Sequence, residues 1–420
     1  MDKIIINGQK SLSGEVNIST AKNAVLPIMV ASILTDDEVI INKAPMLEDV
    51  YVLGRILRSL NVDVIIDKET GKILIDNNYN MGIEANGNLV RKMRASSLLM
   101  GPILAKKGRF RISLPGGCNI GTRPIDLHLK GLTALGADIN IGHGYVEART
   151  KGLIGSKIYL DYPSVGATEN IMMASVLAKG DTIIENAAEE PEIEDLANFL
   201  IAMGAKIYGA GTDRIIVSGV NYLKGVEYTP IYDRIEAGTF MIAAAITHSK
   251  IKINGIKESN LKPVIAKLAE AGVMMEIEGE NIIVDGSDTL LPVDIKTLPY
   301  PGFPTDMQSQ MMSLLSTIKG TSIITETIFE NRFMCVSELK RMGSNIKIEG
   351  RTATIQGVEN LTGAEVRATD LRAGAALILA ALAAKGESVI SGVKHIDRGY
   401  VEIEKKLKGL GAAIRREMES

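Results

Sequence analysis

Six copies of one short pattern divide this chain and limit what it can fold into. In each copy a residue suited to ending a helix follows an apolar stretch, and these residues are Asn61, Gly136, Gly204, Gly272, Gly343 and Gly411. Their spacings are 75, 68, 68, 71 and 68 residues. A period of this kind indicates a repeated supersecondary unit, so the fold is expected to consist of six similar pieces.

Each repeat predicts the same order of elements around this pattern. An amphipathic helix precedes it, for example at 193–203 and 264–271, with apolar residues three and four apart. The glycine ends that helix because it enters the left-handed region without a steric penalty. A β-hairpin follows, such as 276–284 around Gly279.

A second and more apolar helix lies upstream of each pattern. Apolar residues occupy most faces of these helices, so we expect them to be buried. The six segments are 22–34, 94–105, 169–178, 236–247, 306–317 and 371–384. A short strand follows each one, as at 39–41, and the whole repeat therefore predicts an α/β fold.

Three repeats per domain is the natural division of such a chain. The sixth repeat stops before its sheet is complete, and the segment 3–19 is expected to be a hairpin that pairs with it. One domain would then span 22–230, and the other would combine 1–21 with 231–420. The chain would cross twice between the domains, which implies a hinge and a cleft.

Composition excludes several classes of protein. The 47 Lys and Arg residues against 50 Asp and Glu give a net charge of −3, without the surplus that nucleic-acid binding requires. Aromatic residues make up 4% and Trp is absent, which argues against a base-stacking platform. The longest apolar run, 373–384, is 12 residues, short of the roughly 18–20 that span a bilayer. The first ten residues lack a signal peptide's apolar core, so we expect a soluble, cytoplasmic protein.

Cofactor and metal motifs are not found in this sequence. Two cysteines and four histidines without ligand spacing predict neither a disulfide framework nor a metal site. No P-loop and no dinucleotide-binding glycine fingerprint occurs, so neither ATP nor NAD is expected. The expected cofactor list is therefore empty.

Charged and polar residues gather where the apolar helices begin. Helix N-termini attract anions, and several directed at one cleft beside Lys22, Arg94 and Arg372 predict a polyanionic ligand. Taken singly, Asp306 and Asp370 could be ordinary N-caps, but their shared place in the repeats favours a common site. The residues at these positions are Lys22, Asn23, Arg94, Thr168, Glu169, Asn170, Arg234, Glu236, Asp306, Asp370 and Arg372.

The loop 114–124 carries the chain's most unusual local composition. Three glycines and two prolines shape a loop whose backbone can approach a ligand closely. Cys118 beside Arg123 would have a lowered thiol pKa and could act as a nucleophile or acid, the alternative being an inert buried thiol. Cys335 is expected to pack in the core.

Two further arginines occupy the equivalent loop in other repeats. Arg332 and Arg398 precede the second helix of repeats five and six, as the Cys118 loop does in repeat two. Such an arginine could clamp a carboxylate or phosphate with two hydrogen bonds. The alternative for each is a surface salt bridge.

Eight separated segments resemble the enolpyruvyl transferases. They agree in order and spacing from end to end, and they are 21–24, 93–96, 116–118 with 123–128, 164–170, 303–308, 330–333, 370–374 and 395–400. The resemblance implies two inside-out α/β barrels, each built from three βαβαββ units. Two positions depart from the family pattern, Thr20 in place of a glycine and Tyr162 near a position where some members carry a lysine.

The resemblance also implies a reaction and its substrates. The enolpyruvyl group of phosphoenolpyruvate would pass to the 3'-hydroxyl of UDP-N-acetylglucosamine through a tetrahedral intermediate, with release of phosphate, in the first committed step of peptidoglycan precursor synthesis. The partners would be these small molecules, with no nucleic acid and no membrane. Such chemistry needs clustered cations beside one acid and one base.

Residue roles carried over from the family complete the expected site. Cys118 would protonate the methylene carbon and be alkylated by fosfomycin, Asp306 would be the general base and Asp370 would assist proton movements. The expected phosphoenolpyruvate contacts are Lys22, Asn23, Arg123, Arg372 and Arg398. The expected nucleotide-sugar contacts are Arg94, Arg123, Pro124, Ile125, Asp126, Leu127, Ser164, Val165, Asp306 and Ile328.

Three other functions compete with this interpretation. A shikimate-pathway transferase would share the fold, although that branch does not resemble the Gly-Gly-Cys loop. A nucleotide-sugar sensor without catalysis would keep the cleft, yet every proposed acid, base and cation is present here. An RNA-processing enzyme built from similar repeats fits poorly with the acidic charge balance.

Overall fold

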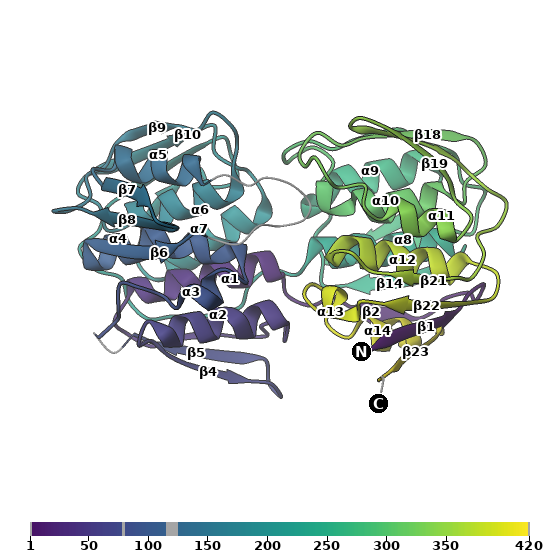
Figure 1. Cartoon of the computed structure of the whole chain (residues 1–420), viewed down its shortest axis with the longest axis horizontal. Coiled ribbons are helices and arrows are strands. Elements are labelled where there is room, and N and C mark those ends of the chain that lie inside the picture. Colours follow the sequence, from purple (N-terminus) through teal and green to yellow (C-terminus); the bar gives the residue numbers. More distant parts are fainter. Residues whose placement is uncertain (1, 78–79, 115–124, 419–420) are drawn as a thin grey trace. The chain divides into compact units, whose positions relative to one another are not determined.

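The structure, a computed structural model, describes residues 2–77, 80–114 and 125–418, and the chain forms two compact units (Figure 1). The central unit comprises the described part of residues 20–231. The terminal unit comprises residues 2–19 and 232–418, and therefore contains both ends of the described chain. Each unit holds three of the six repeats.

The central unit contains the elements of the first three repeats. Its helices are α1 (Lys22–Ala31), α2 (Glu48–Ser59), α3 (Gly87–Val90), α4 (Met100–Lys107), α5 (Asp126–Ala134), α6 (Val165–Ser175) and α7 (Pro191–Ala202), with 3-10 turns η1 (Ser32–Leu34) and η2 (Arg94–Leu99). Its strands are β3 (Val39–Ile41), β4 (Asp63–Asp67), β5 (Lys72–Asp76), β6 (Arg109–Ser113), β7 (Asp138–Gly142), β8 (Tyr145–Arg149), β9 (Lys157–Tyr159), β10 (Asp181–Glu185), β11 (Lys206–Tyr208), β12 (Arg214–Ser218) and β13 (Glu227–Tyr228).

The terminal unit repeats this order with the N-terminal strands added. Its helices are α8 (Arg234–Ile246), α9 (Lys262–Glu270), α10 (Gln308–Leu315), α11 (Val336–Arg341), α12 (Leu371–Ala383), α13 (Val393–Ile396) and α14 (Ile403–Gly409), with 3-10 turns η3 (Glu258–Asn260) and η4 (Thr305–Met307). Its strands are β1 (Lys3–Asn7), β2 (Glu15–Asn17), β14 (Lys250–Asn254), β15 (Met274–Glu278), β16 (Asn281–Asp285), β17 (Ile295–Lys296), β18 (Thr321–Thr325), β19 (Asn345–Glu349), β20 (Thr352–Gln356), β21 (Glu365–Arg367), β22 (Glu387–Ser391) and β23 (Ala413–Glu417).

The residues that end the second helix of each repeat behave as the pattern predicts. All six have positive φ, from 62° at Asn61 to 105° at Gly204. Glycine carries no Cβ to clash in this region, and asparagine tolerates it better than most other residues. The six-repeat prediction is therefore confirmed at the level of the backbone.

The apolar helices lie inside their units and the sheets lie outside. Helices α1, α4 and α6 form the interior of the central unit, and α8, α10 and α12 that of the terminal unit, where every residue from Arg372 to Leu382 is buried. The described strands form six sheets, five of four strands and one of three. In five of the sheets the strand after the apolar helix pairs antiparallel with the second strand of the hairpin, as β10 does with β12, and in the sixth β22 pairs antiparallel with β1 instead. The predicted α/β repeat fold is confirmed.

The N-terminal segment is not a hairpin, and that prediction was wrong. Strand β1 lies between β22 and β23 and pairs antiparallel with both, whereas β2 pairs parallel with β14 in another sheet. The cause is that two different sheets each lack one strand: the sixth repeat lacks the second strand of its hairpin and the fourth lacks a leading strand. The predicted pairing of this segment with the sixth repeat is confirmed.

In the central unit, too, a strand from one repeat completes the sheet of another. Strand β13, at the end of the third repeat, pairs parallel with β3 of the first. Just beyond it, the backbone N–H of Ala21 donates to the Ile231 carbonyl, so the two crossing segments are joined. Thr20 is buried and its hydroxyl donates to the Lys43 carbonyl, which shows how the chain accommodates a threonine at this position.

Membrane-spanning helices are not found in the part of the chain that the structure describes. No helix there is both long enough and apolar enough to cross a bilayer. The buried helices owe their apolar character to packing inside the two units.

Candidate active site

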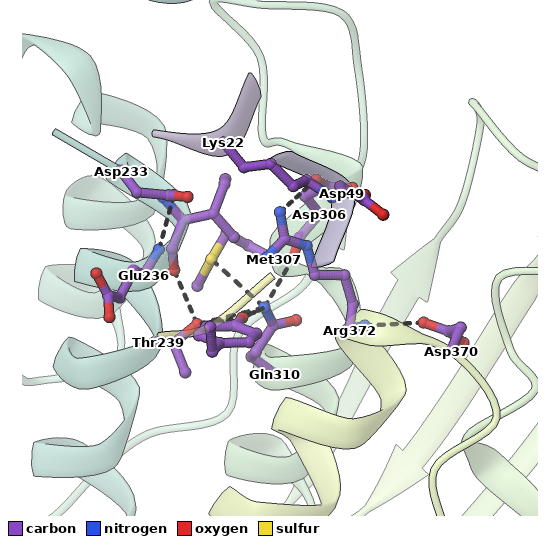
Figure 2. A network of polar contacts seen from close by, with 12 residues as sticks. Lys22, Asp49, Asp233, Glu236, Thr239, Asp306, Met307, Gln310, Asp370 and Arg372 are labelled. Carbon is purple, nitrogen blue, oxygen red and sulfur yellow. Dashed lines mark hydrogen bonds and ion pairs between the residues drawn. The ribbon is translucent and has the colours of Figure 1, made fainter. Parts of the chain in front are cut away.

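Asp306 is held by two buried arginines of the terminal unit. Its Oδ1 accepts a hydrogen bond from Arg332 Nη2 at 2.7 Å, and its Oδ2 accepts one from Arg372 Nη2 at 2.9 Å (Figure 2 shows the Arg372 contact). The arginine side chains are 3% and 4% exposed, against 27% for Asp306. Charge-assisted bonds of this length are among the strongest polar contacts in proteins.

The sequence left open whether Asp306 and Asp370 are ordinary helix N-caps, and the structure gives a different answer for each. The N-cap positions of η4 and α10 are Pro304 and Met307, so Asp306 is not an N-cap. Asp370 is one: its Oδ1 accepts the backbone N–H groups of Arg372 and Ala373 at 2.9 and 3.0 Å. Asp370 is therefore a helix N-cap, and Asp306 is not.

Arg372 remains charged in spite of its burial. Burial alone lowers the pKa of a guanidinium, but the nearby Asp306 carboxylate outweighs it and holds the pKa of Arg372 above its ordinary value. The Asp233 carboxylate acts on Arg372 in the same direction.

The two arginines also carry N–H groups that the described residues leave unpaired. These are Nε of Arg332 and both Nε and Nη1 of Arg372, all buried. A buried donor without an acceptor costs about 1–3 kcal/mol, and more where the group is charged. Three such donors beside Asp306 fit an anion with several oxygens.

Glu326 fixes the segment that contains Ile328. The Glu326 side chain is completely buried; its Oε1 accepts the backbone N–H groups of Ile328 and Phe329 at 2.8 and 3.1 Å. Its Oε2 accepts the hydroxyl of Thr305 at 2.9 Å, and Thr305 is adjacent to Asp306. One carboxylate therefore ties an expected nucleotide-sugar contact to the expected base.

The sequence offered Arg332 only as one of two candidate clamps, without a role at a named substrate, and it did not point to Glu326. Arg332 had a usable signal, since it occupies the loop position of the Cys118 segment in another repeat. Glu326 had none, because it directly follows a β-strand and only its burial shows that it bridges two loops.

In the central unit, Lys22 begins α1 and its Nζ lies 3.3 Å from Oδ2 of Asp49, a contact that Figure 2 also draws. Asp49 is buried, and Lys22 is largely so. Asn23 is exposed on the same first turn, and Arg94 opens η2 half-buried. These residues lie at helix starts, as predicted.

The first turns of α5 and α6 carry the other expected nucleotide-sugar contacts. Ser164 is the N-cap of α6 and its Oγ accepts the N–H of Ala167 at 3.4 Å, while Val165 is the first helical residue. Asp126 is exposed at the start of α5, between the half-buried Ile125 and Leu127. Helix starts of this kind leave backbone N–H groups available to an anion.

Some predicted helix-start residues are instead internal. Because α6 begins at Val165, Glu169 and Asn170 lie more than one turn inside it and are buried. Burial raises the pKa of Glu169 well above its ordinary value, with Glu192 and Glu190 adding to the effect. Their expected place at a helix N-terminus was wrong, because the N-cap at Ser164 was overlooked.

Glu236 lies in the first turn of α8, as predicted, but it is buried and bonded within the terminal unit. It is 2% exposed and accepts hydrogen bonds from Lys406 at 2.6 Å and from the backbone of Ser19 at 2.7 Å. These contacts join α8 to α14 and to the N-terminal segment. The role of Glu236 is therefore to hold the terminal unit together.

The structure tests the prediction for one of the two cysteines. Cys335 is completely buried, and burial raises the pKa of its thiol to about 12, so its predicted place in the core is confirmed. Cys118, with Arg123 and Pro124, lies outside the described residues. Arg398 is exposed, before α14.

Potential metal ligands are scattered within residues 2–77, 80–114 and 125–418. Within these ranges no three His, Cys, Asp or Glu side chains lie together in a way that could hold a metal ion. The arrangement around Asp306 is instead one of paired charges. It can bind anions and accept a proton.

Comparison with known proteins gives three consistent results. The model of the EPSP synthase family (3-phosphoshikimate 1-carboxyvinyltransferase) matches residues 6–407. A UDP-N-acetylglucosamine 1-carboxyvinyltransferase 2 from Clostridium tetani is 66% identical over 99% of this chain and 100% of that protein. A UDP-N-acetylglucosamine 1-carboxyvinyltransferase 1 from Clostridium acetobutylicum is 64% identical over the same shares.

Solved structures agree at the level of the fold. The enolpyruvyl transferase NikO from Streptomyces tendae is similar with a TM-score of 0.90 and 24% identity, over 100% of this chain and 99% of that one. EPSP synthase from Acinetobacter baumannii is similar with a TM-score of 0.78 and 18% identity, over 100% of both chains. At these identities the likeness concerns the architecture alone.

Proposed function

Because this chain belongs to the EPSP synthase family, and within it to the UDP-N-acetylglucosamine 1-carboxyvinyltransferases, we propose how its own residues carry out that group's reaction. The protein is an enolpyruvyl transferase of peptidoglycan precursor synthesis. It transfers the enolpyruvyl group of phosphoenolpyruvate to the 3'-hydroxyl of UDP-N-acetylglucosamine and releases phosphate. We place the reaction in the cytoplasm.

Phosphoenolpyruvate is the anion that the buried arginine donors accommodate. Its phosphate and carboxylate supply enough oxygen acceptors for the unpaired N–H groups of Arg332 and Arg372. This set of donors is the single observation that carries the proposal. By family resemblance, Lys22, Asn23, Arg123 and Arg398 are the remaining contacts of this substrate.

Asp306 acts as the general base once the anion is bound. Both of its oxygens are engaged by arginines before that. An incoming phosphate or carboxylate competes for Arg372, which releases lone pairs on Asp306 for the proton of the acceptor hydroxyl. Anion binding and base activation are therefore coupled.

In the addition step one proton leaves the acceptor hydroxyl and another is added to phosphoenolpyruvate. The acceptor oxygen attacks the C2 carbon of phosphoenolpyruvate and gives its proton to Asp306, while the methylene carbon gains a proton from an acid. Family resemblance assigns that acid to Cys118. In the elimination step the methyl group gives a proton back to the conjugate base of that acid, the C–O bond to phosphate breaks, and the phosphate leaves with the proton that Asp306 had taken. Asp370 assists these transfers from its place at the start of α12.

The nucleotide sugar is bound by helix starts and the loops before them. Ser164 and Val165 at the start of α6, with Arg94 and the segment 123–127, are the proposed contacts on the central unit. Asp306 and Ile328 are those on the terminal unit. Backbone N–H groups at helix starts suit the diphosphate.

The test is phosphate release from phosphoenolpyruvate in the presence of a chosen acceptor. We expect release with UDP-N-acetylglucosamine and none with shikimate 3-phosphate, without added metal or nucleoside triphosphate. A folded preparation that released phosphate only with the second acceptor would reassign the substrate. One that released none with either would overturn the proposal.

A further inference from the structure

Three polar side chains meet among the buried helices of the terminal unit. Thr239 comes from α8 in the fourth repeat, Gln310 from α10 in the fifth and Tyr400 from the segment before α14 in the sixth. The Tyr400 hydroxyl lies 2.9 Å from Thr239 Oγ1, and Gln310 Nε2 donates to the Tyr400 hydroxyl at 3.2 Å. None of the three is more than 2% exposed.

This cluster contacts both members of the Asp306–Arg372 ion pair. Gln310 Nε2 also donates to the backbone carbonyl of Asp306 at 2.8 Å, and Figure 2 shows Gln310 between Thr239 and Asp306. The Arg372 guanidinium carbon lies 5.5 Å from the centre of the Tyr400 ring. Tyr400 therefore contacts Arg372 with its ring and also with its hydroxyl, and the hydroxyl is linked to the Asp306 backbone through Gln310.

Packing alone does not call for this network. The carbonyl oxygen of Gln310 is buried without a hydrogen-bond partner among the residues that the structure describes. An incompletely satisfied polar group in an apolar interior lowers stability, and apolar side chains of the same volume would remove that penalty. What the network provides is a fixed position for a carboxylate and a guanidinium.

We propose that Tyr400 and Gln310 are positioning residues for Asp306 and Arg372. The inference rests on the roles proposed above for these two residues. The hydroxyl of Tyr400 orients Gln310, and Gln310 fixes the turn that carries Asp306, so this part of the network governs proton transfer. The ring of Tyr400 stabilises the guanidinium by a cation–π contact, so this part governs phosphoenolpyruvate binding.

The experiment separates the two parts by steady-state kinetics in both substrates. Tyr400→Phe keeps the ring and is expected to lower kcat about 2- to 10-fold, the equivalent of one hydrogen bond, with KM for UDP-N-acetylglucosamine unchanged. Tyr400→Leu is expected in addition to raise KM for phosphoenolpyruvate about 2- to 5-fold. Tyr51→Phe is the matched control, since it removes a tyrosine hydroxyl from α2 in the central unit.

A double-mutant cycle distinguishes positioning from a merely structural role. Gln310→Met keeps the side chain's length and removes its N–H groups. If the Tyr400 hydroxyl acts through Gln310, then adding Tyr400→Phe to Gln310→Met causes no further loss of kcat. Additive losses, or a Tyr400→Phe variant with the kcat of the unmodified protein, would overturn the inference.

Failure of the inference and failure of the proposed function give different results. Asp306→Asn is measured beside the other variants. If Asp306→Asn loses activity while Tyr400→Phe does not, only the positioning role is wrong. If Asp306→Asn keeps its activity, the proposed base is wrong. Melting temperatures of Tyr400→Phe and Gln310→Met are measured as well, and values well above the assay temperature show that lost activity does not come from unfolding.

Discussion

The guanidinium of Arg332 donates to Oδ1 of Asp306 at 2.7 Å from a side chain that is 3% exposed. With Arg372 on the other oxygen, both carboxylate oxygens are bound by buried guanidinium groups. Buried N–H groups of both arginines have no acceptor among the described residues, so the site is set to accept an anion. Anion binding and the protonation state of Asp306 are therefore linked.

The Asp306→Asn variant tests this link. The amide cannot accept the hydroxyl proton as a base, so we expect kcat to fall about 10²- to 10⁴-fold. The same change makes the site one charge more positive and releases Arg372, so phosphoenolpyruvate should bind more tightly. Steady-state kinetics and calorimetric titration measure the two effects. Weaker binding together with intact turnover would contradict the linkage.

The Arg398→Ala variant tests whether Arg398 is one of the cations that bind phosphoenolpyruvate. A charge-assisted hydrogen bond contributes about 1.5–3 kcal/mol, so the dissociation constant should rise about 10- to 150-fold. Arg415→Ala is the control, because Arg415 is an exposed arginine paired with Glu387 and Glu417. Equal affinities in the two variants would return Arg398 to the role of a surface salt bridge.

The two cysteines are expected to differ in reactivity. The Cys335 thiol is buried and its raised pKa, about 12, leaves almost no thiolate at pH 8. In the Cys118→Ser variant, iodoacetamide should therefore leave the native protein unmodified and add one group in urea, as intact mass would show. Fosfomycin should no longer label this variant. Labelling of the native variant by either reagent would move the reactive thiol to Cys335.

The helices and their order follow from local sequence, and the structure shows why. Glycine ends a helix through its own conformational freedom, and Gly204 has the φ of 105° that its pattern predicts. The apolar character of α8 and α12 is evident from their own residues, which are buried throughout α8 and from Arg372 to Leu382 in α12. Such features depend on neighbours within one helix, so a single sequence is sufficient to predict them.

Strand partners and side-chain contacts depend on residues far apart in the chain. The alternating residues of β1 are compatible with a hairpin and equally with the place between β22 and β23 that the strand occupies. Likewise, nothing near Asp306 in the sequence shows that Arg332 and Arg372 bind its two oxygens. Position within the repeat placed Asp306 and Arg372 in one set of candidates and Arg332 in another, and only the structure distinguishes an ion pair from an N-cap.

Asp195 is expected to make stability depend on pH. Burial raises its pKa from 3.8 to about 6, although hydrogen bonds from the Tyr228 hydroxyl and the Ile231 N–H act in the opposite direction. The folded state therefore holds a proton that the unfolded state releases. The stabilisation is present below pH 4 and is lost as the pH rises to about 6, by about 3 kcal/mol at 1.36 kcal/mol per pH unit.

The Asp195→Asn variant isolates this effect. Urea unfolding from pH 4 to pH 8 is measured for both proteins, and the variant's stability relative to the unmodified protein should increase over pH 4–6. It should then stay level, because Asp195 is ionised in both states above that range. Asp138→Asn, at an exposed carboxylate, is the control. A constant difference across the range would show that the Asp195 pKa is not raised.

Because strand β1 completes the sheet of the sixth repeat, we expect the N-terminal segment to be essential to the fold of the terminal unit. Ile6 of β1 is completely buried and pairs with Ser388 of β22 and Ile414 of β23. Because β1 is an inner strand of this sheet, Ile6→Ala leaves a cavity in the core, and we expect a loss of about 2–5 kcal/mol in urea unfolding. Ile65→Ala on β4, where the side chain is 62% exposed, is the matched control and should change stability by less than about 0.5 kcal/mol. If both variants lost the same small amount, β1 would be an accessory strand, and the sixth repeat would not depend on it.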